Sequence, residues 1–191
     1  MAILRCSKKL LELLSTEKLI ASACAGESGF LDEWYAHLFY WNRKKCLLFT
    51  EAVSLFSFVK ADILKKDLVD IAGLLRKGVA KAMYFEEFPA EAIKHVQSTL
   101  KNVRLGIAAD RSIRGCMNEL IFHWKYAADE YPDKVLDNAP ELNHTIAELP
   151  MRVSTRHGIF PKERFQELLK PLQAARFLCE CRLCAVFVRR Y

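Results

Sequence analysis

A short segment near the middle of the chain carries the residue types that bind anions. Arg111, Arg114 and Asn118 are spaced three and four residues apart, so a helix would place them on one face. Guanidinium groups match the oxygens of phosphate or carboxylate in bidentate geometry, and a helix N-terminus attracts negative charge. The spacing therefore predicts an anion-binding site at these three residues. The alternative is a solvated surface on which both arginines pair with carboxylates such as Asp110 or Glu119.

His37 is a weak candidate for a catalytic base. It lies in an apolar run and shares one face of an expected strand with Tyr35, Phe39 and Trp41. The simpler interpretation is a neutral, buried imidazole that bonds a neighbouring backbone group. A general base needs a partner, and the sequence places no second His or Asp beside it, so the catalytic residues stay unknown. Four further histidines show no metal-ligand spacing: His95, His123, His144 and His157.

A C-x-C-x-x-C cluster near the end of the chain consists of Cys179, Cys181 and Cys184. Three thiolates could hold zinc or an iron–sulfur cluster, but both usually need a fourth ligand, and the intervening residues are not loop-forming. We therefore predict core thiols, with no metal and no other cofactor. The remaining cysteines lie in apolar surroundings and are predicted to be reduced: Cys6, Cys24, Cys46 and Cys116.

Hydrophobic periodicity predicts the elements that must position these residues. The predicted strands cover residues 2–6, 34–41, 46–49, 54–59 and 103–108. The predicted helices begin near Ser7, Leu64, Pro89, Asp110, Pro140 and Pro161. This order favours an α+β fold with a mainly antiparallel sheet of about five strands and helices packed on its faces.

Composition limits the class of protein. The hydrophobic fraction of 52% and the charged fraction of 27% are those of a globular chain, which excludes disorder. We expect a single domain over residues 1–175, with residues 176–191 as a Cys-rich tail packed on it. No apolar run approaches the roughly 20 residues that span a bilayer, and the N-terminus does not resemble a signal peptide, so we expect a cytoplasmic protein without membrane partners. The oligomeric state stays open.

Several landmarks along the chain also resemble a known family. They are residues 3–11, 34–38, 42–50 and 112–120, followed by Leu142, Asn143, Pro150 and Met151. Together they resemble a widespread bacterial family of small proteins classed only as a domain of unknown function. The resemblance implies one folding unit from residue 3 to about Met151 and a bacterial cytoplasmic setting, and it supplies no mechanism. It also implies that Asn often occupies the position of His37, which speaks against catalysis there.

Three hypotheses about function follow. The leading one is a binding module whose basic face engages nucleic acid or an acidic partner protein in a mobile-element or defence setting, because the net charge of +6 permits contact with polyanions. The second is a small enzyme acting on a phosphorylated or nucleic-acid substrate, with Arg111 and Arg114 as the anion clamp and His37 as general base. The third is a structural or oligomerisation protein. Whether the chain is an enzyme is left open, although the common phosphate-binding loop, hydrolase and zinc-protease motifs are absent from the sequence.

Overall fold

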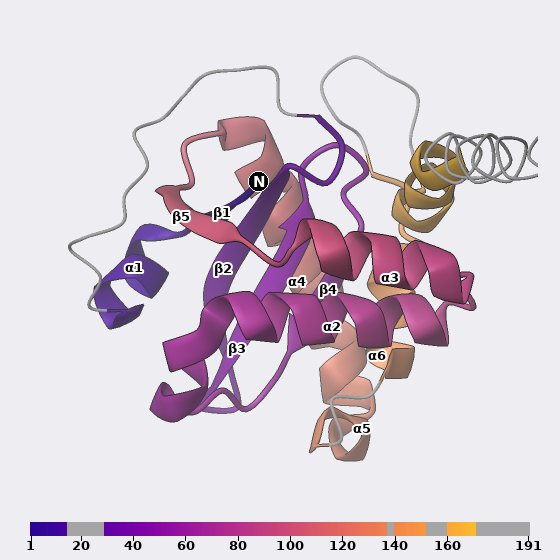
Figure 1. The fold of residues 1–191 in the computed structure, drawn as a ribbon. Coiled ribbons are helices and arrows are strands. Elements are labelled where there is room, and N and C mark those ends of the chain that lie inside the picture. Colours follow the sequence, from indigo (N-terminus) through magenta and orange to yellow (C-terminus); the bar gives the residue numbers. More distant parts are fainter. Residues whose placement is uncertain (15–28, 137–139, 152–159, 171–191) are drawn as a thin grey trace, which may run out of the picture.

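The structure is a computed structural model that describes residues 1–14, 29–136, 140–151 and 160–170 (Figure 1). The strands are β1 (Ala2–Cys6), β2 (Glu33–Trp41), β3 (Lys44–Glu51), β4 (Ser57–Lys60) and β5 (Val103–Ile107). The helices are α1 (Lys8–Leu14), the 3-10 helix η1 (Lys65–Asp70), α2 (Ile71–Phe85), α3 (Ala90–Thr99), α4 (Arg111–Glu130), α5 (Pro132–Leu136) and α6 (Pro140–Ala147). Residues 161–170 are also helical.

The five strands form one mixed sheet in the order β4-β3-β2-β1-β5. β1 runs parallel to both of its neighbours, β2 and β5, whereas β2, β3 and β4 form an antiparallel meander. The predicted α+β class is therefore confirmed, but the prediction of a mainly antiparallel sheet is wrong. The reason is that long connections carry the chain into both parallel pairings, and periodicity shows where a strand lies without showing its partner.

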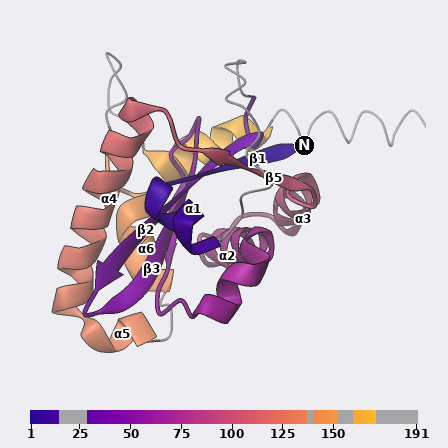
Figure 2. The same cartoon turned by 90° about the vertical axis from the view of Figure 1, so that its left-hand side faces the viewer.

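Helices cover both faces of the sheet and enclose two hydrophobic cores (Figure 2). The first core lies between the sheet and the helices α1, α2, α3 and 161–170. The second lies between the sheet and α4, α5 and α6. Because side chains alternate along a strand, Leu4 of β1 enters the first core while Arg5 faces the side covered by α4. Among the described helices, none has the length and apolar character needed to cross a membrane.

The buried carboxylate of Glu51 holds the turn that precedes β4, the third strand of the meander. Glu51 accepts hydrogen bonds from the backbone amides of Val53 (3.0 Å) and Ser54 (2.7 Å), and from the Ser54 hydroxyl (2.6 Å). These bonds hold the chain in a turn, so β4 begins at Ser57 rather than at Ser54 as the sequence predicts. The turn between β2 and β3 is shorter than the one between β3 and β4. It consists of Asn42 and Arg43, at φ values of 44° and 62°. Two residues of positive φ match the twist of the flanking strands.

Phe165 fastens the 161–170 helix to the first core. Its side chain is fully buried, and its ring lies 4.6 Å from the ring centroid of Phe56 and 5.2 Å from that of Phe30. Phe88 and Trp34 meet it edge-on at 5.7 and 6.4 Å. Aromatic contacts of this geometry add stability beyond the buried area, so this helix belongs to the domain.

Glu86 links three helices through its carboxylate. It follows α2, is almost fully buried, and contacts His144 Nδ1 of α6 at 2.9 Å and Lys162 Nζ at 2.7 Å. A negative charge at a helix C-terminus opposes the helix dipole, so the ammonium group of Lys162 and the hydrogen bond to His144 stabilise it there. The hydrogen bond to Glu86 also raises the pKa of Lys162.

We predict that Phe165→Ala lowers the free energy of unfolding by about 3–5 kcal/mol, because it opens a cavity among packed rings. Urea unfolding followed by circular dichroism measures this change. Phe160→Ala is the matched control, since that ring is 43% exposed, and it should change stability by less than about 0.5 kcal/mol. Equal effects of the two substitutions would show that the 161–170 helix does not hold the core.

Candidate functional site

The N-terminus of α4 is set by its cap. Asp110 Oδ1 accepts hydrogen bonds from the backbone amides of Ser112 (2.7 Å) and Ile113 (3.1 Å). The side chains of Ile113 and Met117 are buried against the sheet, which fixes the rotation of the helix about its axis. Two of the first-turn amides are therefore already paired with a carboxylate. An anion at this helix end would contact side chains rather than these amides.

All three predicted anion-binding residues lie on the outer side of α4. Arg111, Arg114 and Asn118 are exposed, and at about 100° per residue they fall within a sector of roughly 60°. Neither guanidinium group forms an ion pair with Asp110, Glu119 or any other residue in the described part of the chain. The two charges are thus available to an external anion.

The exposed side of α4 continues from cationic to aromatic residues. Phe122 and Tyr126 are 69% and 71% exposed and follow Asn118 at spacings of four. A Cβ added at Gly115 would meet nothing within 4 Å, so the surface between the arginines and the aromatic rings is open. We call the set Arg111, Arg114, Asn118, Phe122 and Tyr126 the outer face of α4. Neither aromatic residue was predicted to belong to the site, although both continue the spacing of four residues from Asn118.

His37 lies on β2 beside the cationic end of this face. Its ring is half-buried, on the side of the sheet that carries Tyr35 and Phe39. Burial lowers its pKa, and the positive charges of Arg114 and Lys9 lower it further. Within the described residues the imidazole has no hydrogen-bond partner, so the expected bond to a backbone group is not found in that part of the chain. Lys9 of α1 was not predicted here, because only the topology brings α1, β2 and α4 together.

These side chains gather where the connections after two parallel strands diverge. β1 and β5 are neighbours and end side by side, with Ala108 donating its backbone hydrogen bond to the carbonyl of Cys6. α1 follows β1 and packs on one face of the sheet, whereas α4 follows β5 and packs on the other. In sheets with parallel strands, ligands bind outside the carboxyl ends of the strands at such a reversal. By this rule, the position of Lys9, His37 and Arg114 is a candidate ligand site on the topology alone.

A buried charge pair lies on the same side of the sheet as His37. Arg5 Nε donates a hydrogen bond to Glu33 Oε1, and the Tyr35 hydroxyl donates to the same oxygen at 2.8 Å. Gly106 lies opposite Arg5, and a Cβ there would come within 3.3 Å of the Ile3 side chain. Burial and the contact with Glu33 raise the pKa of Tyr35, so the phenol stays protonated. Because its charges satisfy each other, we assign this network a structural role.

The cysteines and histidines form no metal site in the described residues. Cys6, Cys46 and Cys116 are buried thiols, and burial raises the pKa of Cys6 to about 12, so it is not a reactive thiolate at neutral pH. Cys24 lies outside the residues that the structure describes. The same holds for Cys179, Cys181 and Cys184 and for the tail to which they belong.

The fold and the site together define an α+β domain with a mixed five-stranded sheet and an exposed cationic and aromatic helix face. The profile of the family described as "Domain of unknown function (DUF6933)" matches residues 3–164, and the chain belongs to that family. The match extends beyond Met151, where the sequence resemblance was expected to end, into the 161–170 helix. No curated protein matches the chain.

We predict that His37 titrates below its usual value of about 6.5 and that Arg114→Ala raises this pKa, because the substitution removes a nearby positive charge. The lowered pKa also means that the contribution of His37 to stability is present above about pH 6.5. This contribution is lost as the pH falls through the folded-state pKa, since the unfolded chain takes up the proton first.

NMR titration of the imidazole resonances measures the pKa of His37 in each variant. Arg111→Ala is the matched control, because Arg111 is not among the charges that act on His37, and it should leave the midpoint nearly unchanged. Equal shifts in both variants, or a midpoint above 6.5 in the parent chain, would contradict this arrangement.

Proposed function

We propose that this protein binds single-stranded nucleic acid along the outer face of α4. The observation that carries the proposal is the combination, on one exposed helix side, of two arginines without ion-pair partners in the described chain and two aromatic rings about 70% exposed. Cationic groups that follow a phosphate backbone, together with aromatic rings on which bases stack, are the two components of single-strand binding.

The cationic end supplies the phosphate contacts. Arg111 and Arg114 project from α4, and Lys9 of α1 adds a further positive charge, which like that of Arg114 lowers the pKa of His37. Guanidinium groups bind phosphate oxygens in bidentate geometry and release condensed counterions, so affinity depends on salt concentration. The Asp110 carboxylate does not cancel these charges by ion pairing, because it bonds the amides of its own helix.

The aromatic end supplies the base contacts and favours single strands. Phe122 lies eight residues after Arg114, which is roughly 12 Å along a helix and spans only a few nucleotides. Each base stacked on an aromatic ring contributes about 1–3 kcal/mol, and this requires bases that are not stacked in a duplex. An acidic partner protein would use the cationic end without such stacking, so the effect of the aromatic residues distinguishes the two partners.

We predict that the double variant Arg111→Ala and Arg114→Ala binds a fluorescent single-stranded oligonucleotide more weakly and with a shallower dependence on salt. Two lost phosphate contacts should reduce the slope of log affinity against log salt by about 1.4. The single variant Arg114→Lys keeps the charge and so should keep the slope, but it should weaken binding because the bidentate fork is lost.

Fluorescence anisotropy at several salt concentrations measures both quantities. The matched control is the double variant Lys94→Ala and Lys101→Ala. It removes the same charge from a different basic surface, a hollow beside α3. If that control reduces the slope as much as the arginine variant does, the outer face of α4 is not the interface.

We further predict that Phe122→Ala combined with Tyr126→Ala weakens single-strand binding by about tenfold or more while leaving the salt slope unchanged. Tyr84→Ala is the control, because Tyr84 is 79% exposed on α2, away from α4. A preference for duplex over single strand, or an unchanged affinity in the aromatic variant, would contradict base stacking and favour an acidic protein partner.

A second candidate function is an enzyme that acts on the bound phosphate. The specific observation is the half-buried His37, whose lowered pKa leaves it neutral at pH 7 and whose ring nitrogens have no partner among the described residues. Such an imidazole can serve as a general base. Incubation with labelled oligonucleotide tests this: cleavage that His37→Asn abolishes, without loss of binding, would establish it, and absence of cleavage in the parent chain would exclude it for that substrate.

A further inference from the structure

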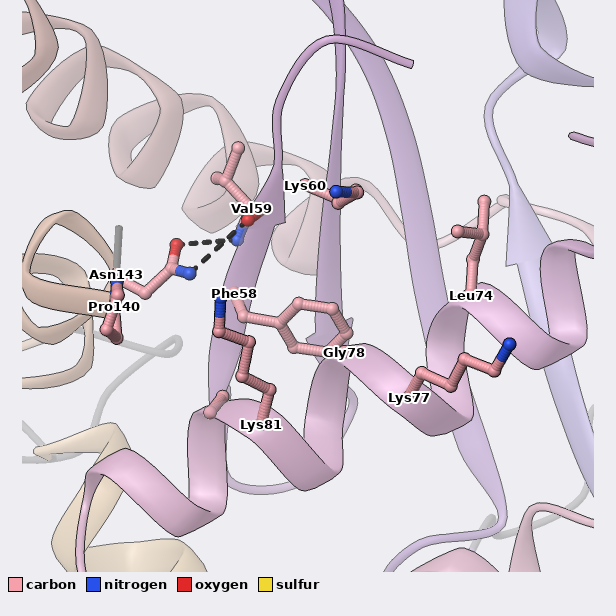
Figure 3. Close-up of a pocket in the computed structure, with 10 residues that line it drawn as sticks. Phe58, Val59, Lys60, Leu74, Lys77, Gly78, Lys81, Pro140 and Asn143 are labelled. Carbon is pink, nitrogen blue, oxygen red and sulfur yellow. Dashed lines mark hydrogen bonds between the residues drawn. The ribbon is translucent and has the colours of Figure 1, made fainter. Parts of the chain in front are cut away.

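A cavity of about 220 Å³ lies between β4, α2 and α6 (Figure 3). Most of its lining is apolar, and four polar side chains complete it. The lining residues are Phe58, Val59, Lys60, Leu74, Lys77, Gly78, Lys81, Ala82, Pro140 and Asn143. No carboxylate is among them, so every charge at the cavity is positive.

The floor of the cavity depends on a glycine. The ring of Phe58 is buried and stacks on Phe49 with centroids 5.1 Å apart, which fixes its position. Gly78 of α2 lies against that ring, and a Cβ at this position would be only 2.1 Å from Phe58 Cε2. Glycine therefore lets the helix and the ring approach each other, and both residues line the cavity.

One wall of the cavity is closed to peptide ligands. Asn143 Oδ1 accepts a hydrogen bond from the Val59 amide at 2.8 Å, and Asn143 Nδ2 donates to the Val59 carbonyl at 3.3 Å. The side-chain amide thus occupies the backbone groups at the open edge of β4, as Figure 3 shows. A peptide that added a further strand to this edge would need the same groups. The occupant must therefore be something other than an added strand.

Three lysines are among the residues that line the cavity. In Figure 3 the amino group of Lys81 rises from α2 toward Asn143 and Phe58, Lys60 lies above the Phe58 ring, and Lys77 extends along α2 below Leu74. None of the three lysines has an ion-pair partner in the described part of the chain. Like charges held near one another repel, so an anion bound between Lys60 and Lys81 would be stabilised by both.

We infer that this cavity binds a small organic anion, with an apolar body about the size of one ring and a carboxylate or phosphate head group. The body would rest on Phe58 and Gly78, and the head group would contact the ammonium groups of Lys60 and Lys81. The volume of 220 Å³ lies between a cavity of about 150 Å³ that accepts benzene and the roughly 300 Å³ at which drug-sized sites begin. This inference does not rest on nucleic-acid binding at α4.

The test is an NMR titration of the full chain with four probes: benzoate, phenyl phosphate, benzyl alcohol and inorganic phosphate. Both aromatic anions should shift the backbone resonances of Val59, Gly78 and Asn143 in a saturable way. Benzyl alcohol lacks the charge and inorganic phosphate lacks the ring, so each should bind at least about tenfold more weakly. The ratio between benzoate and phenyl phosphate shows which head group the site prefers.

Surface variants supply the control without disturbing the fold. Lys60→Gln with Lys81→Gln should weaken benzoate binding by about tenfold or more, because two charge-assisted contacts are lost. Lys65→Gln with Lys66→Gln removes the same charge from exposed positions on η1 outside the cavity and should leave the affinity unchanged. Equal losses in both pairs, equal binding of inorganic phosphate and benzoate, or no binding of either aromatic anion would overturn the inference.

Discussion

β1 is hydrogen-bonded on both sides, to β2 and to β5, and this double pairing constrains the rest of the molecule. A central strand has helices over both faces, so its side chains must suit two interiors. Leu4 meets this demand on one face, being fully buried in the first core. On the other face Arg5 is only 7% exposed, and an unpaired charge at that depth would cost several kcal/mol. Glu33 must therefore lie beside it, which ties the register of β2 to that of β1.

The central strand also determines where chemistry can take place. Because β1 and β5 are parallel and adjacent, their carboxyl ends meet at one edge, and the following helices leave it in opposite directions. α4 begins there, so its first turn comes close to residues from α1 and β2. Arg114, Lys9 and His37 are brought together by this topology, although they are far apart in the sequence. An all-antiparallel sheet would not create such an edge.

Local features such as element bounds and helix faces could be predicted from the sequence. The long-range pairing of strands could not. β1 has the predicted bounds, and the helices that begin at Arg111 and Pro140 start where caps and prolines indicate. The shared direction of Arg111, Arg114 and Asn118 follows from helical geometry alone. The order of the strands does not, because alternation reports that a strand is half-buried without identifying its neighbour. The cavity beside α2 escaped prediction for the same reason: it depends on Gly78 meeting Phe58, which a single sequence does not reveal.

The bonds between Asn143 and Val59 have a consequence for the behaviour of the protein in a crowded solution. β4 is the edge strand of the meander, and an exposed edge invites the strand of another molecule to pair with it. The side-chain amide of Asn143 supplies a donor and an acceptor to that edge, and so satisfies the Val59 backbone groups that an added strand would bind. At the opposite edge, β5 is short and carries the exposed charge of Arg104. Each edge thus carries a different feature that disfavours pairing with the strand of another molecule.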